Sequence, residues 1–227
     1  MSTGEVCIAL ARPQIFNKKP VERLAKMLET GVKVKVIKED LKRHLHECLQ
    51  AEVMKNQKPF TWTRAVHKAF KCPERRFNFW WRIASYLYKT NINKNFARKI
   101  NRKLTMKYGC EIQLGASIGP GLIISHFHGV VINGSCRIGS NFRIRQNSTI
   151  GIGGGKKPGS GEPCILIGDN VSVGAGSCII ANVINIGSNV DIGAMSFINK
   201  DIPDNCVVYT KKTNELLFKV SRESACI

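Results

Sequence analysis

The sequence predicts a mainly β fold, a solenoid of short parallel strands, preceded by an α-helical region. The first observation is that aliphatic residues recur every six positions from Ile112 to Ile198. An α-helix repeats its face about every 3.6 residues and a strand about every two, so a sustained period of six indicates three-sided coils. The second is that Gly, Ala, Ser and Asn accompany these aliphatics, and such residues allow tight corners. The third is that helical spacing replaces this period before residue 109.

The N-terminal region is predicted to be a series of helices separated by glycine and proline. One helix is expected over 20–31 and a second apolar-periodic stretch over about 34–54. Another segment opens near Pro59 and is interrupted by Pro73. Over 75–107, apolar residues recur at three- and four-residue steps with Arg and Lys on the other face, which predicts helical amphipathicity.

The positive charge is concentrated in one quarter of the chain. Of the net charge of +19, residues 51–108 carry +13, from fifteen Lys or Arg and two Asp or Glu, whereas 109–227 carry +2. Such a field attracts an anionic partner. Nucleic acid is not expected, because no nucleic-acid-binding motif accompanies the charge. The aromatic residues of 75–107 either dock this helix on the rest of the protein or rest on an anionic membrane surface. The pattern leaves both interpretations open.

The cysteines and the N-terminus bear on the compartment. Nine cysteines are scattered singly, without a CxxC pair, which is typical of reduced thiols in the cytosol. His44, His46 and Cys48 lie close together, but no second cluster stands at zinc spacing, so we expect a solvated helix face and no metal site. No apolar run reaches 18 residues and no basic stretch precedes the short N-terminal apolar patch, so we expect a cytoplasmic protein.

The period of six continues through two small slips and one interruption. The register slips by two residues between 124 and 132 and by one between 179 and 186. A glycine-rich run over 151–161 interrupts it. We expect the aliphatics to form one buried ladder: Ile112, Ile118, Ile124, Ile132, Ile138, Ile144, Ile150, Ile167, Val173, Ile179, Ile186, Ile192 and Ile198.

Three segments of this region resemble the serine acetyltransferase branch of the hexapeptide-repeat acyltransferases: GCEIQLGASIGPGLIISHFHGVVIN, NFRIRQNSTIG and IGDNVSVGAGSCII. They look closest to relatives that O-acetylate capsular or colanic-acid-type polysaccharides. The resemblance implies a left-handed parallel β-helix, a homotrimer or a dimer of trimers, acetyl-CoA as co-substrate and no metal. We therefore predict a basic helical region over 1–108, the acyltransferase domain over 109–209 and a C-terminal tail over 210–227.

Acetyl transfer to a hydroxyl needs a base, and the resemblance assigns this role to His126. His126 lies in Ser125-His126-Phe127-His128, at the two-residue slip, where the coil must bulge and can direct a side chain outward. An acidic residue fifteen positions upstream orients the base in the family, and Glu111 occupies that position, where the family usually has Asp. Ser125 and His128 are expected on the substrate side, with His128 as the reserve base.

The resemblance also places the acetyl-CoA groove. Small residues let the pantetheine arm approach the backbone, and lysines pair with the phosphates. The expected small residues are Gly153, Gly154, Ala175 and Ala194, and the expected lysines are Lys156, Lys157 and Lys200.

The acceptor is the point on which the sequence departs from the family motif. Serine acetyltransferases have Asp directly before the base and an Arg-His pair beyond the glycine-rich loop, whereas this chain has Ser125 and, at the loop exit, Gly161–Cys164. We therefore predict an O-acetyltransferase for a sugar hydroxyl of a capsular polysaccharide or its lipid-linked precursor, in the cytoplasm or at the inner face of the membrane. The alternative is L-serine O-acetyltransferase of cysteine biosynthesis, with which the terminal Ile227 agrees. A second alternative is a noncatalytic trimeric scaffold.

Overall fold

A computed structural model of the chain describes residues 33–153, 164–211 and 213. The chain forms two compact units, residues 1–40 and 41–227. Of helix α2 (Lys33–Leu49), the part from Leu41 onward belongs to the second unit, which also holds every other described helix and strand. The helix expected over 20–31 lies outside the described residues.

The helices follow the punctuation of the sequence, with one difference. Helix α4 begins at Pro73, so the predicted interruption there is confirmed. Proline suits the first position of a helix, because a backbone N–H at that position would have no partner within the helix. The amphipathic stretch 75–107 is divided into two helices, because Asn91 adopts a left-handed conformation and the Asn93 side chain caps the next helix by accepting from Phe96 N. After α2, the elements are η1 (Gln50–Met54, a π-helical turn), α3 (Trp62–Lys71), α4 (Pro73–Lys89) and α5 (Lys94–Tyr108).

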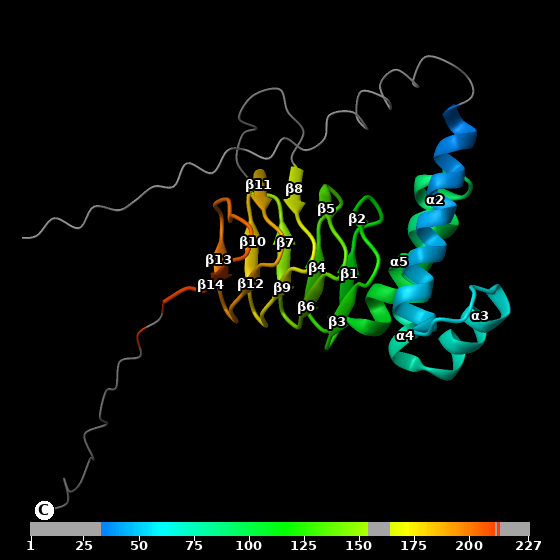
Figure 1. Ribbon diagram of the computed structural model, residues 1–227, viewed down its shortest axis with the longest axis horizontal. Helices are drawn as coiled ribbons and strands as arrows, with labels where there is room; N and C mark the ends of the chain where they lie inside the picture. Colours follow the sequence, from blue (N-terminus) through cyan, green and yellow to red (C-terminus); the bar gives the residue numbers. More distant parts are fainter. Residues whose placement is uncertain (1–32, 154–163, 212, 214–227) are drawn as a thin grey trace, which may run out of the picture. The chain divides into compact units, whose positions relative to one another are not determined.

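The described residues between Cys110 and Val208 form a parallel β-helix with three faces, as predicted (Figure 1). Among the described residues, each of the first four coils contributes one short strand to each face, and strands pair only with their equivalents in neighbouring coils. The fifth coil contributes strands to two faces and meets the second sheet only through a bridge between Ile202 and Ile186. The first sheet is β1 (Cys110–Ile112), β4 (Val130–Ile132), β7 (Thr149–Gly151), β10 (Cys178–Ile180) and β13 (Phe197–Ile198). The second is β2 (Ser117–Ile118), β5 (Cys136–Ile138), β8 (Cys164–Ile167) and β11 (Val183–Ile186). The third is β3 (Ile123–Ser125), β6 (Arg143–Arg145), β9 (Ser172–Val173), β12 (Asp191–Ile192) and β14 (Val207–Val208).

The predicted aliphatic ladder forms the core of these coils. All its members are buried except Ile124, which is half-buried at the end of the first coil. Glycine is required where coils approach closely. A Cβ at Gly139, for example, would lie 2.7 Å from the carbonyl carbon of Gly168, closer than carbon atoms can pack. The period of six therefore corresponds to the coil geometry that it predicted.

A ladder of asparagines sets the register at one corner. Asn141, Asn170, Asn189 and Asn205 all have φ between 56° and 59°, a left-handed conformation that asparagine tolerates better than most residues. Each side-chain amide donates to the next, over 3.0, 3.0 and 2.9 Å. These bonds run along the β-helix and fix each coil above the next.

Side chains from the helices satisfy the open edge of the first coil. An uncovered strand edge presents unpaired backbone groups and invites aggregation, so solenoids need a cap. Five side-chain donors from α4 and α5 reach carbonyls of this coil. They are Trp81 Nε1 to Ile112 (3.1 Å), Asn101 Nδ2 to Ile112 (3.2 Å), Lys89 Nζ to Ala116 (2.7 Å), Arg82 Nη1 to Ile118 (2.6 Å) and Asn78 Nδ2 to Leu122 (3.0 Å).

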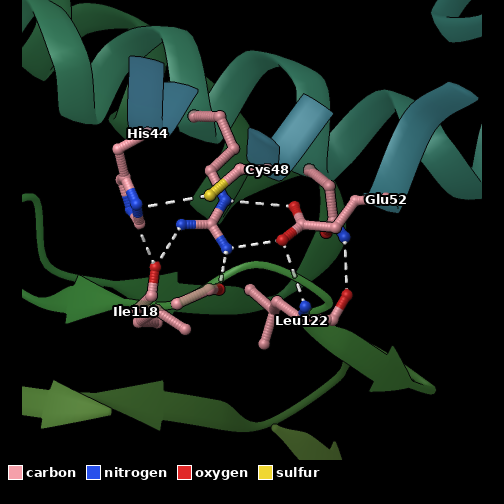
Figure 2. A network of polar contacts seen from close by, with 8 residues as sticks. His44, Cys48, Glu52, Ile118 and Leu122 are labelled. Carbon is pink, nitrogen blue, oxygen red and sulfur yellow. Dashed lines mark hydrogen bonds and ion pairs between the residues drawn. The ribbon is translucent and has the colours of Figure 1, made fainter. Parts of the chain in front are cut away.

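A buried ion pair lies at the centre of this cap (Figure 2). Arg82 Nε donates to Glu52 Oε2 over 3.0 Å, and its Nη2 also donates to the Gly119 carbonyl over 2.8 Å. Glu52 Oε1 accepts from Leu122 N over 3.1 Å. Burial opposes the charge on Arg82, but the Glu52 carboxylate outweighs this effect, so the pKa of Arg82 is raised. Part of the basic charge is therefore structural.

The same cap corrects the prediction of a solvated face at His44 and Cys48. His44 Nε2 lies 3.2 Å from the Ile118 carbonyl oxygen, and Cys48 Sγ lies 3.5 Å from the same nitrogen (Figure 2). Cys48 is fully buried, and burial raises the pKa of its thiol to about 12. The prediction was wrong because this face of α2 packs on the first coil. Among the described residues, no group of three or more His, Cys, Asp or Glu side chains is arranged to hold a metal ion.

Along the described part of the chain, no helix combines the length and apolar character that crossing a bilayer requires. Contact of the basic surface with an anionic membrane stays a prediction.

Lys89 should make the stability of the protein depend on alkaline pH. Burial, with Arg82 and Arg137 adding repulsion, lowers the pKa of Lys89 from 10.5 to about 8. Between these values the unfolded chain binds more protons than the folded chain, so the free energy of unfolding should rise with pH across this window. The rise is at most about 3 kcal/mol. Urea unfolding between pH 7 and 10.5 should show it in the wild type and not in Lys89→Met; equal slopes would contradict this role.

Candidate active site

The loop between β3 and β4 carries His126 on the predicted bulge. Ser125 pairs with Arg145 and Val131 with Thr149, so this corner holds two more residues than the equivalent corner of the next coil. His126 is exposed and has φ 63°, a conformation uncommon outside glycine. The bulge therefore holds the imidazole outside the coil, although its role as the base stays a prediction.

Phe127 anchors this bulge to the helices. Its ring lies 5.0 Å from the ring of Phe77 and 5.2 Å from that of Tyr108, as measured between centroids. The aromatic contacts turn Phe127 toward the helical region, while its neighbour His126 stays exposed. The sequence predicted a bulge here but not the side chain that holds it in place.

His128 packs against the start of the first strand. A Cβ added at Gly109, which caps α5 with φ 61°, would lie 2.8 Å from His128 Nδ1. Only glycine fits beneath this ring in that conformation. His128 is nevertheless exposed, so its predicted place beside the substrate stays open.

Glu111 lies on the outer face of β1, beside Val131 of β4. Its side chain is exposed, and the loop carrying His126 leads directly into β4. Both residues are described, and the structure records no hydrogen bond or ion pair between them in the single chain. The pairing of Glu111 with His126 therefore stays a prediction.

The candidate acetyl-CoA residues flank the same sheet. Ala175 and Ala194 precede β10 and β13, as His126 precedes β4. All three therefore lie at the edge formed by the amino-terminal ends of the strands in the sheet β1-β4-β7-β10-β13. The Ala175 carbonyl accepts from Met195 N over 2.7 Å, which stacks the two corners. Gly153 and Lys200 follow β7 and β13 and lie at the opposite edge. The remaining candidates, Gly154, Lys156 and Lys157, lie outside the described residues.

Sequence reasoning missed one charged residue near this loop. Arg145 is exposed at the end of β6 and is the cross-strand neighbour of Ser125, which is half-buried. Two arginines flank the inward Ile144, and such outward positions in a strand are where charged side chains are expected. The alternation of outward and inward residues along this strand could therefore have indicated Arg145.

Comparison with known proteins relates this fold to one enzyme class. No family model matches the chain. A serine acetyltransferase of Staphylococcus epidermidis is 44% identical over 128 residues, 56% of this chain and 57% of that protein. One of Synechococcus elongatus is 39% identical over 129 residues, 56% of this chain and 50% of that protein. The chain is similar to serine acetyltransferases. Both matches span only about half the length of these curated relatives.

A solved structure supports the same similarity at the level of the fold. Serine acetyltransferase isoform 3 from Entamoeba histolytica, in complex with cysteine, aligns with a TM-score of 0.61 and 25% identity. The alignment covers 88% of this chain and 68% of that chain. The left-handed parallel β-helix with an N-terminal helical region is therefore confirmed.

The similarity contradicts the prediction of a polysaccharide acceptor. That prediction rested on the uncharged Ser125 and on the loop exit Gly161–Cys164, yet the relatives are serine acetyltransferases. The prediction was wrong because the absence of a charged side chain at one position of the motif does not exclude serine as the acceptor. Another residue of the fold can supply a charge, and Arg145 lies directly beside Ser125.

Proposed function

We propose that this chain is an acetyl-CoA-dependent L-serine O-acetyltransferase. The observation that carries the proposal is the 44% identity to a serine acetyltransferase, on a chain whose corner bulge exposes His126. A noncatalytic scaffold would need neither this bulge nor an exposed histidine on it.

In the proposed reaction, His126 acts as general base on the serine hydroxyl. As the hydroxyl oxygen attacks the thioester carbonyl carbon, the imidazole accepts its proton and a C–O bond forms. The tetrahedral intermediate then collapses, the C–S bond breaks, and the imidazolium returns the proton to the departing thiolate. The products are O-acetylserine and free coenzyme A. Imidazole suits both transfers because it changes protonation near neutral pH.

Glu111 has a supporting role in this proposal. Its exposed carboxylate lies on the strand beside β4, into which the His126 loop leads. A carboxylate near an imidazolium stabilises the charge that forms during proton transfer and orients the ring. We expect the two side chains to approach when the substrates bind, because catalytic hydrogen bonds often tighten only in the complex.

The acetyl-CoA arm is proposed to lie along the edge that holds Ala175 and Ala194, whose short side chains lie at the same corner of the coils as His126. We expect Lys200, at the opposite edge, to pair with phosphate groups. A groove on the side of a solenoid offers only one wall, so we expect a homotrimer, or a dimer of trimers, in which a neighbouring subunit completes the site.

A cytoplasmic location fits this proposal. The seven cysteines in the described ranges are all free thiols, among them the buried Cys110 and Cys136, and free thiols persist in reducing compartments.

The proposal is tested by following thiol release from acetyl-CoA with the full chain. Addition of L-serine should produce saturable release of free thiol, well above the rate with acetyl-CoA alone. Heat-denatured protein serves as the control for the spontaneous reaction. Release that does not respond to serine would contradict the proposed function.

A further inference from the structure

We propose that Arg145 binds the carboxylate of the acceptor amino acid, an inference that rests on the proposed acetylation of serine. Arg145 is the last residue of β6 and is exposed. Its partner across the sheet is Ser125, which directly precedes His126. Adjacent strands lie about 4.8 Å apart, so Arg145 stands on the strand next to the loop that carries the proposed base.

The guanidinium of Arg145 is available for a ligand. Among the residues that the structure describes, no carboxylate is paired with it. This differs from Arg76, which donates to the carbonyls of Ala69 and Phe70, and from the buried Arg82. Its neighbours in the sheet are short as well. Ser125 lies on one side, and on the other side Gly174 follows Val173, which pairs with Ile144. The side chain therefore has room to move toward the His126 loop.

The acceptor itself requires a cation close to the base. Only a few bonds separate the hydroxyl of serine from its carboxylate, so a group that binds the carboxylate must lie within one side chain's reach of His126. Ser125 carries no charge. Arg145 offers a planar pair of N–H donors that matches a carboxylate, and such charge-assisted bonds are the strong ones. The position of Arg145 thus assigns it a role in selecting an amino acid over a neutral alcohol.

The test compares L-serine with L-serinamide, which keeps the hydroxyl and the ammonium group but replaces the carboxylate with a neutral amide. Thiol release and acetylated product are measured for the full-length wild type, Arg145→Gln and the matched control Arg143→Gln. Arg143 is an exposed arginine on the same strand, paired with Ile123 instead of Ser125. The readout is the ratio of kcat/KM for serine to kcat/KM for serinamide.

We expect this ratio to fall by about tenfold in Arg145→Gln and to change little in Arg143→Gln. Activity on serinamide should persist in Arg145→Gln, which shows that the variant is folded. The role of Arg145 would be overturned by an unchanged ratio in Arg145→Gln, including the case in which the activities on serine and on serinamide fall equally. It would also be overturned if the ratio fell equally in Arg145→Gln and Arg143→Gln. If the wild type acetylates serine but the ratio behaves in one of these ways, only this inference fails. If the wild type forms no O-acetylserine, the proposed function fails with it.

Discussion

Replacing His126 with Ala is expected to lower kcat for serine acetylation by about 10²–10⁴-fold. The imidazole takes the acceptor proton in the proposed transition state, so its loss affects the chemical step. The KM for acetyl-CoA should change little, because the base acts on the acceptor hydroxyl. Steady-state thiol release at saturating acetyl-CoA and serine gives kcat directly.

His128→Ala tests the reserve base, because His128 is an exposed histidine on the same loop. Both His128→Ala and Glu111→Gln should lower kcat less than His126→Ala does, because the base remains in each of them. Full activity in His126→Ala together with loss in His128→Ala would reverse the two assignments.

Replacing Glu52 with Leu is expected to reduce the free energy of unfolding by about 3–5 kcal/mol. The variant leaves the Arg82 guanidinium buried without its carboxylate, and Leu122 N without an acceptor. Urea unfolding at pH 7 measures the change. Glu47→Leu is the control, because Glu47 is an exposed glutamate close by on the same helical segment.

A double variant separates the loss of the pair from a packing defect. Adding Arg82→Met to Glu52→Leu removes the unpaired charge and should recover part of the lost stability. If Glu52→Leu is as stable as Glu47→Leu, the ion pair is not the centre of the cap.

The β-helix could be predicted because its defining contact recurs every six residues. Each hexad places one aliphatic inward, so the series Ile132, Ile138 and Ile144, with one residue on each face of a coil, is visible in the sequence as well as in the core. The two-residue slip was equally visible, because it changes the spacing between Ile124 and Ile132. A repeated local geometry thus leaves a repeated sequence signal.

The helical cap could not be predicted in the same way. Arg82 and Lys89 look like solvated charges on an amphipathic helix, and only the three-dimensional contact with Ile118 and Ala116 shows that they serve the backbone. Contacts between residues far apart in the chain leave no period. The break after Lys89 depends on the left-handed conformation of Asn91 and on the cap that Asn93 supplies, and spacing reveals neither.

The acceptor was mispredicted for a related reason. A motif read along the chain compares Ser125 only with its neighbours in sequence, whereas the sheet places Arg145 beside it from the next coil. Cross-strand neighbours in a solenoid are about twenty residues apart, here from position 125 to position 145. The charge available to a substrate can therefore be assessed only once the register is established.

The central claim is that the acetyl group moves from coenzyme A to the hydroxyl of serine on this chain. The most direct test incubates the wild type with acetyl-CoA labelled with ¹³C in the acetyl group and with L-serine, and then analyses the products by mass spectrometry while free thiol is counted. We predict labelled O-acetylserine in an amount equal to the thiol released, with both lost in His126→Ala. Thiol released without labelled O-acetylserine, or no release at all, would contradict the claim.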